Sequence, residues 1–116
     1  PIGSVTLIVD GLKAAFPGGE CQDGRGEVRA YLSGALPAVG LPSEMSGPAL
    51  CRDGNLAFDL ASPSGREREE VTILAPNKYR VKLFIKPVSP RVEQVIRAKG
   101  FVPSEDGYAY EEERTI

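Results

Sequence analysis

The sequence predicts a mainly β fold: a curved antiparallel sheet, either an open roll or sandwich-like, with one short helix near the C-terminus at about residues 90–99. Three observations predict it. The 13 Gly and 10 Pro among 116 residues recur every few positions, which suits short strands. Several stretches alternate apolar and polar residues with the period of a strand. The 41% hydrophobic and 26% charged residues are typical of a globular chain, and this length predicts a single domain, residues 1–116.

Two strands and a loop are predicted in the first half of the chain. Residues 4–10 alternate, and the strand continues through Phe16 until Pro17-Gly18-Gly19 forces a turn. A second strand covers residues 27–33 and ends at Gly34. Residues 35–50 are rich in Pro and Gly, so we expect an irregular loop there. Its apolar residues would pack against the sheet; they are Leu36, Val39 and Leu41.

Three further strands are predicted between residues 55 and 86. Residues 55–62 form the first, and a Pro-Ser-Gly turn follows it. The charge run 66–70 is interpreted as a solvated strand end leading into a strand at 71–75. Residues 78–86 show the clearest alternation, with one apolar face for the core and one basic face. The basic face consists of Lys78, Arg80, Lys82 and Lys86.

One helix and a closing strand complete the predicted fold. Ser89 is a good N-cap, Pro90 suits the first helical position, and Gly100 suits the end of the helix. Three apolar residues fall on one helix face: Val92, Val95 and Ile96. Residues 107–114 begin with aromatic side chains, end with acidic ones and are predicted to form the last strand.

Cys21 and Cys51 are the only cysteines, and they lie in similar surroundings. Each precedes an Asp-Gly turn that leads into an alternating stretch, 27–33 or 55–62. If these two strands are neighbours, a disulfide is geometrically reasonable, and closing its 30-residue separation would stabilise the fold by roughly 3–4 kcal/mol. Such a bond implies an oxidising compartment. The alternative is a pair of reduced, buried cysteines in a cytosolic protein, or a reactive thiol.

The composition argues against several function classes. The chain has no His, which excludes His-based triads and His metal ligands, and two cysteines are too few for a tetrahedral zinc site. The net charge of −2 disfavours nucleic-acid binding. The acidic runs 67–70 and 111–113 lack an apolar pocket, and no Gly-rich phosphate loop precedes a helix. We therefore expect no catalytic residues, no metal and no cofactor. No apolar stretch approaches the roughly 20 residues of a membrane span.

Positive charge is concentrated in residues 78–99, which contain seven Lys or Arg and one Glu. The basic face of the strand at 78–86 is therefore a candidate surface for an acidic partner. The alternative is that its cations form cross-strand ion pairs with acidic residues of the neighbouring strands. The acids considered are Glu69, Glu111 and Glu113.

The order of motifs in the second half resembles a known family. A strand that follows Cys-x-x-Gly at 51–54 is succeeded by a Ser-Pro-Ser-Gly turn at 62–65 and by Asn77-Lys78-Tyr79-Arg80-Val81. A helix from Ser89-Pro90 to Gly100-Phe101 and a closing Gly107-Tyr108 come next. Together they resemble the C-terminal part of type II secretion system protein N (GspN), best over residues 51–110. The chain departs from the family at 111–114, where the family usually closes with Gly and an apolar residue.

The resemblance implies a non-enzymatic structural subunit of the type II secretion system. It implies the periplasmic domain of an inner-membrane protein, held by an N-terminal anchor outside this sequence, that contributes to export of folded proteins across the outer membrane. Partners would be other secretion subunits, namely the inner-membrane platform or the secretin, bound through sheet edges or the basic face. The resemblance assigns no site residues, and the sequence indicates no oligomeric state.

A domain that binds envelope lipid or glycan is the alternative function. The two functions differ in the apolar face of the sheet, which would be an open cleft in a carrier and closed by the helix in a subunit that binds protein. The residues that test this are Val5, Leu7, Phe58, Leu83 and Ile85. An enzyme would instead need a pocket that gathers carboxylates with raised pKa values.

Overall fold

The structure is a computed structural model that describes residues 4–33, 42–87 and 89–115. The strands are β1 (Ser4–Ala15), β2 (Asp23–Ser33), β3 (Glu44–Arg52), β4 (Asn55–Ala61), β5 (Glu67–Ala75), β6 (Lys78–Ile85), β7 (Val102–Ser104) and β8 (Gly107–Thr115). A 3-10 turn, η1 (Pro17–Gly19), lies between β1 and β2, and the helix α2 (Pro90–Ala98) follows β6. Within these ranges, no helix has both the length and the apolar character needed to cross a bilayer.

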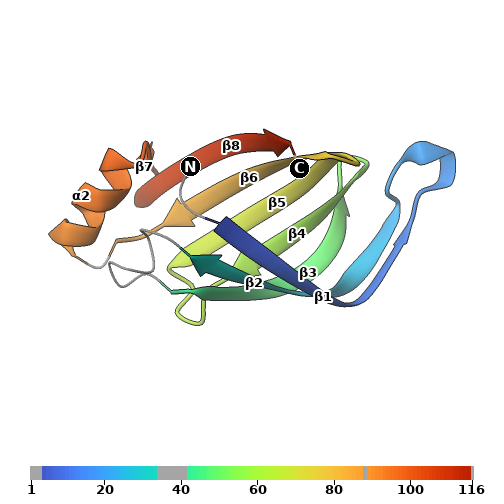
Figure 1. The fold of residues 1–116 in the computed structure, drawn as a ribbon, viewed down its shortest axis with the longest axis horizontal. Coiled ribbons are helices and arrows are strands. Elements are labelled where there is room, and N and C mark those ends of the chain that lie inside the picture. The colour runs from blue at the N-terminus through green and yellow to red at the C-terminus, as the bar shows by residue number, and fades with distance from the viewer. Residues whose placement is uncertain (1–3, 34–41, 88, 116) are drawn as a thin grey trace.

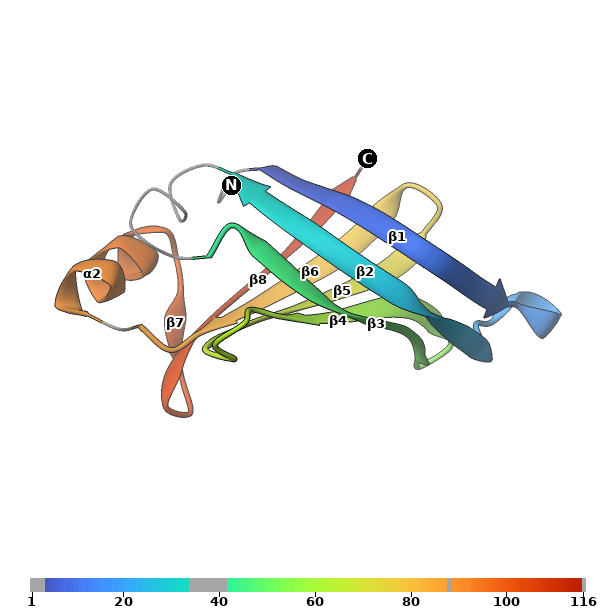
Figure 2. The same cartoon turned by 90° about the horizontal axis from the view of Figure 1, so that it is seen from below.

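All the strands belong to one antiparallel sheet, in the order β1-β2-β3-β4-β5-β6-β8-β7 (Figure 1). The predicted mainly β fold with one short C-terminal helix is confirmed, in its open-sheet form. The sheet curves, so that β1 at one edge and the end of β8 turn toward the same side (Figure 2). We call the face on this concave side the inner face and the opposite one the outer face.

The core lies on the inner face. Residues directly opposite each other in an antiparallel pair place their side chains on the same face. One such row is Phe58, Val71 and Val81, and its neighbour is Leu60, Glu69 and Leu83. The apolar residues of these rows join a cluster that also includes Val92 and Ile96 of α2 and the following Phe101. The helix therefore closes one end of the core.

The predicted strand at 78–86 and the predicted helix are both confirmed. β6 buries its alternate residues Val81, Leu83 and Ile85. Ser89 caps α2, because its hydroxyl accepts the backbone N–H of Val92 at 3.3 Å. Gly100 has φ of +99°, a conformation that glycine adopts freely, so it ends the helix where predicted. β7 was not predicted, because three residues that include a Pro carry no recognisable alternation.

The predicted loop at 35–50 is wrong over its second half, where Glu44–Arg52 forms β3. The Gly and Pro that suggested a loop have specific places in the strand. A Cβ at Gly47 would meet the Asp59 carbonyl oxygen of β4, so glycine permits a close approach of the two strands. Pro48 lies at the last position of the β2–β3 register, and the β3–β4 pairing is interrupted at Gly47 and Pro48, so the missing N–H costs little there. Leu36, Val39 and Leu41 lie outside the described residues.

The predicted solvated strand end at 66–70 is also wrong in part. β5 begins at Glu67, and both Glu67 and Glu69 are buried, with 5% and 0% of their surface exposed. Counting back from Val71 in steps of two places both side chains on the inner face. The pairing partners confirm that position, since Glu69 lies opposite Leu60 and Leu83.

Candidate functional site

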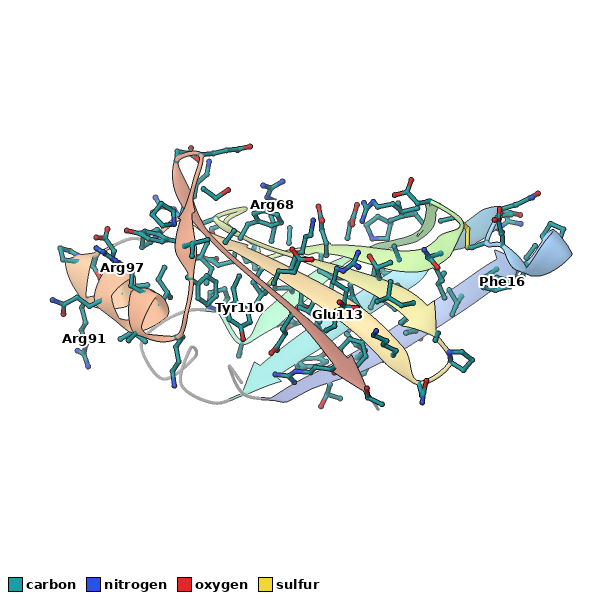
Figure 3. The ribbon with its side chains drawn as sticks, turned by 90° about the horizontal axis from the view of Figure 1, so that it is seen from above. Phe16, Arg68, Arg91, Arg97, Tyr110 and Glu113 are labelled. Carbon is teal, nitrogen blue, oxygen red and sulfur yellow. A yellow bond between two sulfur atoms is a disulfide. The ribbon has the colours of Figure 1, made fainter. Side chains whose placement is uncertain are left out.

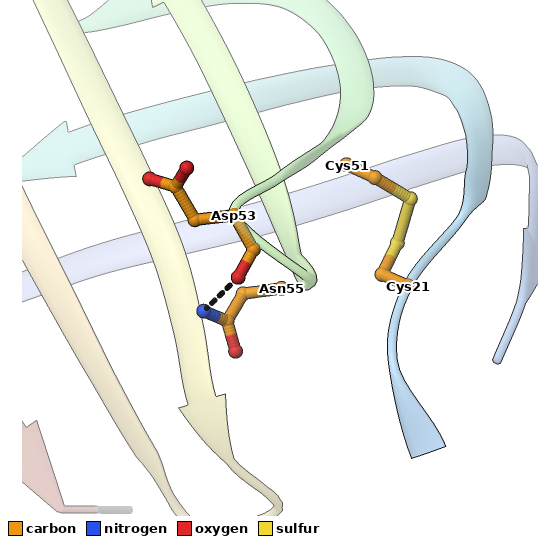
Figure 4. Close-up of a disulfide and its surroundings, with 4 residues drawn as sticks. All are labelled: Cys21, Cys51, Asp53 and Asn55. Carbon is orange, nitrogen blue, oxygen red and sulfur yellow. Dashed lines mark hydrogen bonds between the residues drawn. A yellow bond between two sulfur atoms is a disulfide. The ribbon is translucent and has the colours of Figure 1, made fainter. Parts of the chain in front are cut away.

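Cys21 and Cys51 form a disulfide, with their Cα atoms 5.5 Å apart (Figure 4). Cys51 lies near the end of β3, and Cys21 precedes β2. The backbone N–H of Cys21 also donates to the Gly54 carbonyl at 2.8 Å, in the tight β3–β4 turn. The connection between β1 and β2 is therefore held to the body of the sheet both covalently and by a backbone hydrogen bond. A disulfide is consistent with an oxidising, extracytoplasmic compartment.

The disulfide arises from a different strand arrangement than the sequence suggested. The strands that follow the two cysteines, β2 and β4, are not neighbours, because β3 lies between them. The bond joins the segment before β2 to the strand that pairs with β2. The predicted pairing of the cysteines is confirmed, although the condition attached to it, that the two following strands are neighbours, is not met.

The basic face of β6 lies on the outer face of the sheet, opposite acidic residues of β8. Lys78 forms an ion pair with Glu113 at 3.4 Å, and Arg80 forms one with Glu111 at 3.3 Å. At the end of the strand, Lys86 is 3.0 Å from Asp106, and its hydrogen bond lowers the pKa of the Asp106 carboxyl. These pairs are largely exposed and contribute little to stability. Glu69, the third acid considered as a partner, is on the inner face and takes no part.

Lys82 differs from its neighbours on this face. It lies between Glu70 and Glu111 in the register, yet it forms no ion pair with the described residues. It lines a groove of about 320 Å³ together with Arg52, Asp53, Asn55, Glu70, Thr72, Leu74 and Arg80. Beside this groove, Arg52 donates to Asp59 at 2.6 Å, and this hydrogen bond raises the pKa of the Arg52 guanidinium. The groove is polar and carries both signs of charge.

Two carboxylates of β5 are buried, and their environments differ. Glu67 accepts a hydrogen bond from the Ser62 hydroxyl at 2.7 Å. Neither carboxylate oxygen of Glu69 has a hydrogen-bond partner in the described chain, and burial raises its pKa to about 7. β8 also places ionisable side chains on the inner face, where Glu69 lies. They are Tyr108, Tyr110, Glu112 and Arg114. Of these, Glu112 and Arg114 pair with each other at 2.6 Å.

Sequence reasoning missed Glu69 and the Arg52–Asp59 pair. The alternation that defined the strand at 71–75, extended backward, would have placed Glu69 on the buried face. No signal along the chain connects Arg52 with Asp59, since their contact depends on the β3–β4 turn. In the described parts of the chain, no three Asp, Glu or Cys side chains gather as a metal-binding cluster.

No family model matches the chain, and neither a curated protein nor a solved structure shows significant similarity to it. The function is therefore inferred from the geometry described above and from the motif resemblance.

Proposed function

We propose that this chain is a non-enzymatic, protein-binding domain of the bacterial periplasm and a structural subunit of a type II secretion system. The succession of motifs over residues 51–110 supports the secretion assignment through its resemblance to GspN. The Cys21–Cys51 disulfide supports a periplasmic location, because disulfides persist in that compartment. The resemblance also supports attachment to the inner membrane through an N-terminal anchor.

The outer face over β3–β6, with the ion pairs that β6 forms to β8, carries the protein-binding part of the proposal. Its groove presents Lys82, which forms no ion pair among the described residues although Glu70 and Glu111 lie opposite it in the register. A partner that brings a carboxylate to Lys82 would gain a charge complement at small desolvation cost. A polar groove of alternating charge fits a protein surface, whereas an acyl chain needs an apolar one.

The inner face supports a protein-binding subunit over a lipid or glycan carrier. Phe58, Leu83 and Ile85 are at most 4% exposed. They belong to the same cluster as Val92 and Ile96 of α2, so side chains of the described chain fill the face over β4–β6. Leu7, nearer the edge, remains 36% exposed. Little inner surface over the central strands is left for an acyl chain.

A capture experiment tests this function. The oxidised domain is immobilised, exposed to solubilised envelopes that contain a type II secretion system, and the bound platform and secretin subunits are detected. We expect capture by the wild type and a roughly tenfold loss of affinity in Lys82→Glu, with steeper salt dependence in the wild type. Arg91→Glu changes the net charge equally on an exposed position of α2 and serves as the matched control.

Two results would count against the proposal. If the wild type captures no secretion subunit from envelopes in which a tagged secretion subunit captures its partners, the secretion assignment fails. If Lys82→Glu binds as well as Arg91→Glu, the outer face is not the binding surface.

A further inference from the structure

We propose that the domain self-associates through the free edge of β1, which pairs with β1 of a second copy in an antiparallel, two-fold symmetric arrangement. This inference goes beyond the secretion role and concerns the β1 edge, apart from the groove around Lys82 that is proposed to bind a secretion subunit. β1 pairs with β2 on one side, and no strand of the described residues lies on its other side. Such an edge leaves backbone N–H and C=O groups that another strand can satisfy.

The edge is also where exposed apolar side chains concentrate. Of the six large hydrophobic residues exposed in the described chain, four lie on β1 or directly after it, and they are Leu7, Ile8, Leu12 and Phe16. Their exposed fractions range from 36% to 50%. Figure 3 shows Phe16 at the tip of the hairpin, at the opposite end of the molecule from Arg91 and Arg97 of α2. Leu7 lies opposite the buried Ala30 on the inner face, and Ile8 lies opposite the exposed Arg29 on the outer face, so the apolar side chains border the free edge on both faces. Exposed apolar side chains gathered at one edge favour contact with another molecule there.

The charges on β1 face like charges within their own sheet. Asp10 lies opposite Glu27, and Lys13 lies opposite Arg25. All four side chains are exposed, and none forms an ion pair within the described residues. Like charges directly opposite each other destabilise a sheet. The monomer therefore contains two unfavourable cross-strand pairs at its free edge.

A bulge in β1 places Asp10 and Lys13 on the same face. The β1–β2 register shifts between these two residues, so both lie on the outer face although they are three positions apart. Gly26 of β2 lies beside the bulge, and a Cβ there would lie 2.9 Å from the Leu12 Cα. The bulge therefore requires glycine at position 26. The bulge is also the reason that the oppositely charged Asp10 and Lys13 lie on one face.

A second copy supplies the missing counter-charges by symmetry. We place the two-fold axis between the two β1 strands, level with the Gly11–Leu12 peptide. Asp10 then lies opposite Lys13 of the second copy, and Lys13 lies opposite its Asp10. The row across the joined sheets then runs from Glu27 and Asp10 of one copy to Lys13 and Arg25 of the other, which is two acids followed by two bases. The same register places Leu7 near the end of β1 of the second copy, which Phe16 directly follows, so exposed apolar side chains also lie close together there. A net charge of only −2 per chain opposes this approach weakly.

The second copy is the occupant that this charge pattern favours. A strand from a different protein would need a base to face Asp10 and an acid to face Lys13. It would also need these two residues on one face at the spacing that the β1 bulge produces. The second copy has both by virtue of its own sequence, and a two-fold axis closes the assembly as a dimer.

Charge-reversed variants test the register. In Asp10→Lys, and separately in Lys13→Glu, each homodimer would contain two like-charge pairs across the interface, so we expect the dimer Kd to rise roughly tenfold. In a one-to-one mixture of the two variants, every pair is opposite again, and heterodimers should form as readily as the wild-type dimer. Sedimentation equilibrium of the oxidised domain measures all of these. Each variant also replaces a like-charge pair with β2 by an opposite-charge pair, because residue 10 lies opposite Glu27 and residue 13 opposite Arg25. We therefore expect both variants to fold, and far-UV circular dichroism checks this.

Arg91→Glu, at the far end of the molecule, should dimerise like the wild type. A wild type that stays monomeric up to about 100 µM would overturn the inference. Single variants that dimerise as well as the wild type, with no gain on mixing, would overturn it too. If the wild type is monomeric but Asp10→Lys abolishes capture of a secretion subunit, the β1 edge binds a different protein and not a second copy. Lys82→Glu remains the separate test of the secretion role.

Discussion

The two edges of the sheet differ in length, charge and cover. The N-terminal edge is β1, a strand of 12 residues whose only charges are Asp10 and Lys13. The C-terminal edge ends in β7, a strand of three residues that contains Pro103, next to the acidic Glu111–Glu113 segment of β8. Short strands, Pro and charges are the means by which proteins prevent edge-to-edge pairing. The C-terminal edge has all three, whereas β1 is long, contains no Pro and has one acid and one base beside its bulge, so β1 is the edge more open to pairing.

The edges are also held to the body of the sheet by different means. The N-terminal hairpin is tied by the Cys21–Cys51 disulfide and the hydrogen bond from Cys21 to Gly54. The C-terminal end is held by packing, with the Phe101 and Tyr110 rings 5.2 Å apart and α2 in the core. One edge therefore depends on a covalent bond and the other on buried apolar surface, and the two can be perturbed separately.

Removal of the disulfide should have the largest effect and should act mainly on the N-terminal edge. For Cys21→Ala with Cys51→Ala, we expect a loss of roughly 3–4 kcal/mol in the free energy of unfolding, from the entropy of closing the loop between the cysteines. Urea denaturation measures this loss. Hydrogen exchange should rise more in β1–β2 than in β8. Reduced wild type serves as the control, and an equal rise at both edges would contradict the comparison.

Ionisation of Glu69 should affect both edges alike, because β5 lies in the middle of the sheet. The pKa of Glu69 is about 7 in the folded chain, against an ordinary value of 4.5. The folded state therefore favours the protonated acid. Stability is greatest below the unfolded pKa and falls as the pH rises through about 7, by about 3 kcal/mol in total.

Glu69→Gln removes this ionisation and should flatten the fall. The free energy of unfolding, measured by urea denaturation between about pH 4 and about pH 9, gives the slope for each variant. Glu113→Gln, at an exposed position, should keep the wild-type slope. An identical pH dependence in the wild type and Glu69→Gln would show that the buried carboxyl is not responsible.

Loss of the helix cap should have the smallest effect and should act on the C-terminal end alone. In Ser89→Ala the Val92 N–H loses its acceptor, so we expect a loss of about 1 kcal/mol in the free energy of unfolding. Hydrogen exchange should rise in α2 and β7. Ser89→Asp keeps a capping acceptor and should restore most of the loss. Increased exchange in the β1–β2 hairpin would mean that the two ends are coupled.

Local signals predicted much of the fold. The alternation of β6, the Ser89-Pro90 start of α2 and the Gly100 end are patterns between residues close in the chain, so they were recognisable without a structure. The predicted loop over β3 failed for the opposite reason. Gly47 and Pro48 are breakers in isolation and are tolerated only because of where β2 and β4 lie. The secretion role and its partners were predicted from motif order, and they stay predictions.

The sequence by itself determined the strand period, the helix limits and which two cysteines could pair, because each depends on residue types at short spacing or on there being only two cysteines. Tertiary structure decided that β3 lies between β2 and β4, that Glu69 lies in the core, and that Asp10 and Lys13 face like charges at a free edge. The physical reason is that periodicity belongs to a single segment. Neighbours, register and edges are set by burial between segments far apart in the chain.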